Sequence, residues 1–360
     1  MEWRLAESPM FVAAEGGGEP LHGISGAFLD RRDRLIIANG GAHEIVAVHL
    51  TDPGSPLVFG AEGRGPGEFA TLTAIHAWQG DSILALDSEL RRVTLFAPDG
   101  GVAWVRDFPD IGSPPGVLAT TTWPAVLGAF GDGSVLLRSA PYLNGHGADS
   151  DTAYVQLFRW IPTYAIVDTL NTPIPWMEVA RQGGRLVGPH FRAEATEVPV
   201  HDEAFVTGLG RGPALVVYGT DGNVLRHMEV RTDTQQVNDA VLGAYRDWLL
   251  ARVPETAQDA ISRRFDATPV AAQVPLFDRL LFDELGRIWI QIKGDQVQHY
   301  ELDKRDPKKW QVHGEHGLIG VITSPGPYQI VAIRNGMVVG IWRDTDGVET
   351  VRVYELQDTQ

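Results

Sequence analysis

The stretch GAFLDRRDRLIIANGGAHEIVAVHLTDPGSPLVFG (residues 26–60) returns in altered form as LTAIHAWQGDSILALDSELRRVTLFAPDGGVAWVRD (residues 72–107). Each copy runs as strand, polar turn, strand ending in Asn39 or Asp87, short loop, strand, turn and strand. The strands are rich in aliphatic residues, and Gly, Asp and Asn punctuate the turns. A repeat of about 45 residues with this content is typical of the four-stranded blades of a β-propeller.

The rest of the chain continues the pattern of short strands. FDELGRIWIQ from Phe282 matches the turn and second strand of the repeat, and Asp-Gly pairs mark further turns. We therefore predict an all-β fold, a six-bladed β-propeller of four-stranded antiparallel blades, as a single domain over residues 1–360. The blades are expected near 22–60, 70–108, 124–170, 186–231, 274–322 and 327–356.

Two segments need separate treatment. The last blade shows three strands, so we expect MFVAAEG (10–16) to supply its outer strand and to close the ring, which removes free sheet edges. Residues 233–253 place apolar side chains at helical spacing, and a second helix is expected at about 255–265. This predicts a helical insertion at about 233–265, before blade five. Its aromatic residues are interpreted as a buried face, and a partner-binding or lid helix is the alternative.

Composition limits the function. The chain has 360 residues, no cysteine and a net charge of −16. Such a surface repels phosphate backbones, so we expect no nucleic-acid partner. The lack of cysteine excludes a thiol nucleophile, thiolate zinc ligands and disulfides. No apolar run approaches the roughly 20 residues of a membrane span, and Met1–Arg4 carries no signal core, so we expect neither a transmembrane segment nor a signal peptide in this chain.

The string GRGPGEF (63–69) is the most specific motif. It resembles the G-x-G-P-G-E-F signature of bacterial six-bladed β-propellers related to NHL-repeat proteins, and 283–291, 308–322 and 347–356 resemble later strands of that family. The resemblance implies the fold and an extracytoplasmic location, in the periplasm, the cell envelope or the medium. The family's usual arginine after the tryptophan strand is Gln291 here. If that arginine faces a ligand in the family, the resemblance implies a different ligand for this chain.

The same motif has a physical interpretation without the family. Three glycines and a proline permit a tight crossover between blades, with Phe69 as its anchor. Glu68 is expected to accept backbone N–H bonds or to pair with Arg64. We favour this structural role over a role in ligand binding.

A propeller binds ligands near its axis, where the first strand of each blade lines a funnel. Histidines and carboxylates that converge there could bind a divalent cation or act as acid and base. Structural alternatives are turn caps for Asn39 and Asp87, an ion pair between Asp278 and Arg279, and a hydrogen-bonded core position for His76. The candidate ligand-binding residues are His76, His190, Arg192, Asp278, Arg279, Asn39, Asp87, Arg64 and Glu68.

The turn containing His313 and His316 also holds potential metal ligands. We interpret it as a solvated turn between two strands.

No motif for a nucleophilic serine, a metalloprotease helix or a phosphate loop is present. We therefore predict a non-catalytic exported or cell-envelope propeller, a monomer without a cofactor, that binds a protein, peptide or small ligand at its funnel face. A structural part of a larger envelope complex is not separable from this by sequence. The alternative is a hydrolase or lyase with an axial Ca²⁺ or Zn²⁺. It requires at least three of His76, His190, Asp278, Asn39, Asp87 and Glu68 to approach one point.

Overall fold

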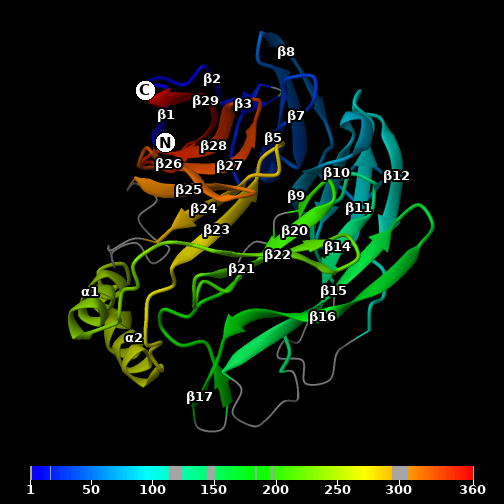
Figure 1. Ribbon diagram of the computed structural model, residues 1–360. Coiled ribbons are helices and arrows are strands. Elements are labelled where there is room, and N and C mark those ends of the chain that lie inside the picture. Colours follow the sequence, from blue (N-terminus) through cyan, green and yellow to red (C-terminus); the bar gives the residue numbers. More distant parts are fainter. Residues whose placement is uncertain are drawn as a thin grey trace.

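The computed structural model describes residues 2–16, 18–112, 124–143, 151–182, 185–195, 198, 200–293 and 307–359. It is a six-bladed β-propeller of four-stranded antiparallel sheets with two helices, which confirms the predicted fold class (Figure 1). Each blade follows the chain order of its strands, from the first strand at the funnel to the fourth at the outside.

Blade one consists of β5 (Ile24–Leu29), β6 (Arg34–Asn39), β7 (Glu44–His49) and β8 (Asp52–Phe59). Blade two consists of β9 (Leu72–Ala77), β10 (Ile83–Asp87), β11 (Arg92–Phe96) and β12 (Val102–Asp107). Blade three consists of β13 (Ala125–Ala129), β14 (Val135–Arg138), β15 (Thr152–Ile161) and β16 (Ile166–Glu178).

Blade four consists of β19 (Val200–His201), β20 (Ala204–Thr207), β21 (Ala214–Gly219) and β22 (Val224–Glu229). Blade five consists of β23 (Phe277–Phe282), β24 (Ile288–Ile292), β25 (Lys308–Gly314) and β26 (Gly317–Ser324). Blade six consists of β27 (Tyr328–Arg334), β28 (Met337–Arg343), β29 (Glu349–Thr359) and β2 (Phe11–Ala13). Two short hairpins lie outside the blades, β3 (Glu15–Gly16) with β4 (Glu19–Pro20), and β17 (Ala180–Gln182) with β18 (Arg185–Val187).

The ends of the chain meet in blade six. β2 pairs antiparallel with β29, from Phe11 opposite Val353 to Ala13 opposite Val351. β1 (Glu2–Leu5) pairs with the last residues of β29 and also makes a parallel bridge to β26 of blade five. One continuous sheet therefore joins blades five and six, a connection that the sequence analysis did not anticipate.

A local motif repeats at the hairpin between the first two strands of a blade. Asp30 accepts the backbone N–H groups of Arg32 and Arg34 and pairs with the Arg34 guanidinium at 2.7 Å. Asp283 does the same for Arg287 at 2.6 Å and also accepts the Trp289 indole N–H. The sequence similarity of FLDRRDR and FDELGR is thus a repeated aspartate-centred turn.

The core lies between the blades. Ile36 and Ile45 of blade one pack with Phe69 and Ile75 in an apolar layer shared with blade two. Equivalent layers separate the other neighbouring blades, because both faces of each sheet carry aliphatic or aromatic side chains. The layer between blades five and six contains three tryptophans, Trp3, Trp289 and Trp310.

The helical insertion consists of α1 (Asp239–Leu250) and α2 (Glu255–Ala267), which stand beside the ring near blades four and five (Figure 1). Its first helix begins six residues later than predicted. The Asn238 side chain caps it by accepting the Val241 N–H at 3.0 Å, and Gln236 before it forms a strand bridge with Gln273.

Blade four also begins later than predicted. Its first strand, β19, starts at Val200 rather than near residue 186. The segment around Phe191 instead packs against the insertion, with Phe191 fully buried beside Val241 and Val274. A segment that was expected to line the funnel therefore packs against the helices instead.

Candidate functional site

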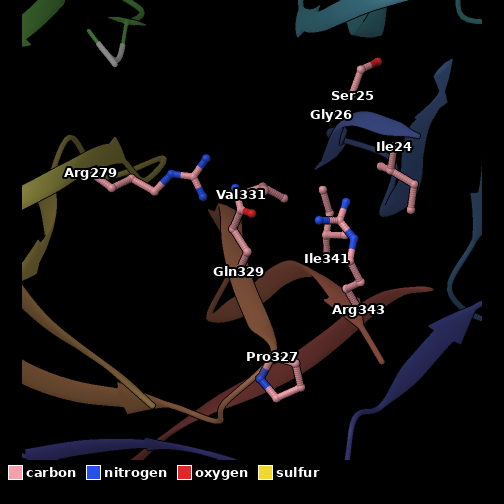
Figure 2. A pocket seen from close by; sticks show the side chains of 9 residues that line it. All are labelled: Ile24, Ser25, Gly26, Arg279, Pro327, Gln329, Val331, Ile341 and Arg343. Carbon is pink, nitrogen blue, oxygen red and sulfur yellow. The ribbon is translucent and has the colours of Figure 1, made fainter. Parts of the chain in front are cut away.

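A cavity of about 270 Å³ opens where the first strands of blades one, five and six meet. β27 lies against β5 on one side and β23 on the other. The walls come from the start of β5, from β23, and from both β27 and β28 (Figure 2). The lining residues are Ile24, Ser25, Gly26, Arg279, Pro327, Gln329, Val331, Ile341 and Arg343.

Arg343 enters this cavity from the end of β28. Its guanidinium pairs with Glu349, the residue directly opposite on β29. The second carboxylate oxygen of Glu349 accepts the backbone N–H of Ile24 at 2.9 Å. The Glu349 side chain is 4% exposed, whereas that of Arg343 is 38% exposed. The buried carboxylate thus fixes the arginine at the mouth of the cavity and links blade six to blade one.

Arg279 enters from β23. Its guanidinium donates to the Ile330 carbonyl at 3.0 Å. In the amide orientation that satisfies both groups, the Gln329 side-chain oxygen accepts from the same guanidinium at 2.5 and 2.7 Å. Figure 2 shows Arg279 extending toward Val331, and Arg343 rising past Ile341 toward Ile24. The two guanidinium groups thus border one space from different blades.

Ser25 is also part of the wall. Its Oγ is buried and has no hydrogen-bond partner within the described part of the chain. Figure 2 shows this oxygen pointing away from the two guanidinium groups, so the hydroxyl is not presented to the cavity.

Of the predicted site residues, Arg279 lies at this cavity. Its neighbour Asp278 accepts a hydrogen bond from Gln291 at 2.9 Å and lies 3.9 Å from the Lys293 ammonium. Gln291, where the resemblance predicted an arginine, therefore contacts the carboxylate of Asp278.

Asn39 and Asp87 are buried turn residues. Asn39 accepts the His22 N–H and donates to Glu44, both at 2.9 Å. Asp87 accepts the backbone N–H groups of Ala70 at 2.7 Å and of Leu90 at 2.9 Å. The contact of Asp87 with Leu90 is the turn-capping role weighed as the structural alternative. The Asn39 side chain makes no capping hydrogen bond to the short helix that follows it and instead connects His22 with Glu44.

Glu68 and Arg64 belong to the crossover between blades one and two. The Glu68 carboxylate accepts the Gly65 N–H at 2.6 Å, and Phe69 is fully buried. The sequence analysis did not anticipate that Arg92 holds this crossover. Its guanidinium donates to the backbone carbonyls of Arg64, Gly65 and Glu68 at 2.6–2.9 Å. Gly67 has φ +81°, and a Cβ there would lie 2.8 Å from Val102, so glycine is required.

His76 lies on β9, the first strand of blade two. Its Nε2 is buried and has no hydrogen-bond partner among the described residues, so the expected hydrogen bond is missing at this nitrogen. Burial lowers its pKa to about 4. The imidazole is therefore neutral in the folded protein at neutral pH.

His190 and Arg192 are not on a funnel strand, contrary to the expectation for blade four. The His190 ring stacks on Phe265 of α2 at 4.1 Å between centroids, and Nε2 lies 3.0 Å from the Phe265 carbonyl oxygen. Burial lowers its pKa. Arg192 pairs with Glu194 at 2.7 Å.

The prediction that His313 belongs to a solvated turn is wrong, because the residue is buried on β25. It is 2% exposed, at the end of β25, and its Nε2 lies 3.0 Å from the Gln311 side-chain oxygen. Burial, with a smaller contribution from the Arg226 charge, lowers its pKa. His316, in the turn itself, is exposed.

The metal-dependent alternative requires at least three of six named residues to approach one point. These six residues instead have separate surroundings, in turns, in a crossover, on β9, beside α2 and next to Lys293. Within the described ranges, no three His, Asp or Glu side chains are grouped to hold a metal ion. The described helices also include none that is long and apolar enough to cross a membrane.

Sequence reasoning missed Arg343, Gln329, Ser25 and Glu349. One signal was available for Arg343. It ends the second strand of its blade, as Asn39 and Asp87 do in blades one and two. A comparison of equivalent positions would have placed it at the same rim.

The sequence matches no model of a known protein family and no curated protein. Among solved structures, a member of the DUF4221 family from Bacteroides vulgatus aligns with a TM-score of 0.59 at 10% identity, over 99% of each chain. A candidate exported protein from Bacteroides fragilis aligns with a TM-score of 0.51 at 9% identity, over 100% of this chain and 99% of that one. A streptogramin B lyase aligns with a TM-score of 0.45 at 11% identity, over 98% and 90%. Similarity at this level of identity shows the propeller fold and does not assign an activity.

Proposed function

We propose that this chain is a non-catalytic binding protein that takes a small ligand, or the end group of a peptide or protein, into the axial cavity. The observation that carries the proposal is the cavity itself, formed by the first strands of three blades and lined by two arginines, a glutamine and a serine. Concave sites of this kind, with a few placed polar groups in an otherwise apolar wall, are typical of ligand pockets.

The chemistry of the wall supports binding over catalysis. The nine lining residues include no histidine and no carboxylate. General acid–base catalysis needs a group that exchanges a proton near neutral pH, and a guanidinium stays protonated. The polar groups present are suited to hold and orient a ligand.

A filling variant tests the proposal. Val331→Phe places a ring into the cavity from β27, and the matched control Val224→Phe makes the same change on exposed β22. Thermal unfolding is measured with a panel of amino acids, organic acids and sugars. Compounds that stabilise the wild type should fail to stabilise Val331→Phe and should still stabilise Val224→Phe. Ligand stabilisation that survives in Val331→Phe would place the site elsewhere.

The proposal includes an exported or cell-envelope location. The GRGPGEF resemblance and the name of the Bacteroides fragilis protein support it. Detection of the protein by antibody in cytosolic, envelope and secreted fractions of the source cells tests it, and recovery in the cytosol alone contradicts it.

A further inference from the structure

The inference concerns the class of ligand, and it rests on the proposed function. We propose that the axial cavity binds a small organic or inorganic anion, through a carboxylate or phosphate group held between the guanidinium groups of Arg279 and Arg343. Three observations carry this: the charge of the wall, the support behind each arginine, and the volume.

The charge of the wall is opposite to that of the molecule. The chain carries 46 acidic and 30 basic residues, yet two of the nine lining residues are arginines and none is acidic. A cationic recess in an acidic surface focuses the field on a small site and selects anions there.

Each arginine is held in place by neighbouring groups of the protein. Glu349 is fixed by the backbone of Ile24 and holds one side of the Arg343 guanidinium. The carbonyl of Ile330 and the amide of Gln329 hold Arg279. Such support reduces the entropy lost when a planar guanidinium binds an anion through parallel N–H bonds.

The volume sets the size of the ligand. About 270 Å³ equals the liquid volume of about nine waters. This suits a small mono- or dicarboxylic acid, a phosphate ester of a small alcohol, or the terminal carboxylate of a chain.

The test is titration calorimetry with charged and uncharged probes of equal size. Succinate, glutarate and inorganic phosphate are the anions, and succinamide is the uncharged control. We expect at least one anion to bind with a Kd of about 1 mM or tighter, and succinamide not to bind. The affinity should fall as NaCl is added.

Variants of the two arginines locate the site. Arg279→Gln and Arg343→Gln should each weaken anion binding by about 10- to 100-fold, the effect of losing a hydrogen bond to a charged group. Arg343→Lys, which keeps the charge and loses the fork, should fall between. The control is Arg106→Gln on exposed β12, which should leave affinity unchanged. Circular dichroism of each variant confirms that it is folded.

The outcomes separate the ligand class from the binding function. Succinamide binding as well as succinate, with both blocked by Val331→Phe, would leave the binding cavity in place and overturn the anion assignment. If none of the anions binds with a Kd of about 1 mM or tighter, the anion assignment is also overturned. Anion binding that is indifferent to Val331→Phe and to both arginine variants would overturn the cavity as the site, and the proposed function with it.

Discussion

At the scale of single residues, arginines fix turns, a strand pair and a crossover between blades. Arg34 and Arg287 close aspartate-centred turns, Arg343 joins β28 to the buried Glu349, and Arg92 holds a crossover by three carbonyl groups. A guanidinium suits these positions because it offers five donors in a rigid plane and never loses its charge. The cost of removing one should therefore depend on how many acceptors it leaves behind.

We expect Arg92→Ala to lower the free energy of unfolding by about 2–3 kcal/mol, because three crossover carbonyls lose a charged donor. The matched change Arg106→Ala, on the neighbouring strand β12, removes an exposed side chain and should cost less than about 0.5 kcal/mol. Urea unfolding of both variants measures the difference. Equal losses would show that the crossover does not depend on Arg92.

His76, whose Nε2 is buried, predicts a pH dependence. Its pKa is about 4 in the folded protein and 6.5 in the unfolded chain, so the unfolded chain binds more protons between these values. The free energy of unfolding should therefore fall as the pH drops from about 6.5 to 4, by up to about 3 kcal/mol from this residue. The contribution is fully present above the unfolded value and is lost toward the folded one.

Denaturant unfolding at several pH values checks this with two variants. His76→Phe should flatten the curve between pH 6.5 and 4 relative to the wild type, while the exposed His316→Phe should retain the wild-type slope. His313, also buried with a lowered pKa, should leave some dependence in both variants. An unchanged slope in His76→Phe would mean that this histidine does not carry the effect.

At the scale of elements, the four-residue strand β1 connects blades five and six. It adds to β29, bridges to β26, and inserts Trp3 between blades five and six. The Trp3 ring lies 6.0 Å from Trp289 between centroids and is 8% exposed. The strand thus acts as a wedge at the junction where the ring closes.

Trp3→Ala should lower the free energy of unfolding by about 3–5 kcal/mol, because it removes a large buried ring from a packed layer. Tyr164→Ala is the control, since Tyr164 is 73% exposed in a turn and should change stability by less than about 0.5 kcal/mol. Trp3→Phe should recover part of the loss. A Trp3→Ala variant as stable as Tyr164→Ala would show that β1 is detached in solution.

The blades could be predicted from sequence because their information is local. Alternating aliphatic residues and an aspartate-centred turn recur within about 45 residues, so a blade can be recognised from its own stretch of sequence. Blade four shows where this fails. The segment around His190 has the composition of a strand, but Phe191 packs against α1, and no local signal reports a contact with a helix some fifty residues later.

The cavity could not be predicted for a related reason. Its wall combines residues from the start of β5 with residues near the end of the chain, and Glu349 contacts Ile24 across 325 positions. Funnel residues were sought among first strands and, in blades one and two, at the ends of second strands. This found Arg279 and omitted Arg343, which ends the second strand of blade six. The residues that support an arginine, such as Gln329, carry no motif at all.

At the scale of the whole molecule, two electrostatic effects oppose each other. The net charge is −16, so repulsion between the excess carboxylates destabilises the compact folded state. Ion pairs attract, but exposed ones such as Arg32–Asp81 and Arg211–Asp151 contribute about 0–1 kcal/mol each. The Arg34–Asp30 pair is buried, with side chains 8% and 2% exposed, so salt screens it little. Repulsion should therefore be the larger salt-sensitive effect.

We accordingly expect NaCl to stabilise this protein at pH 7. Raising the salt from about 0.01 M to 0.15 M shortens the Debye length from about 30 to 8 Å, which weakens long-range repulsion more than contacts at 3 Å. The urea midpoint should rise, by an amount equivalent to about 1–2 kcal/mol. Near pH 5.1, the isoelectric point from the sequence, net repulsion vanishes and the same salt should give no rise. A midpoint that falls with salt at pH 7 would mean that exposed ion pairs, and not self-repulsion, dominate the surface electrostatics.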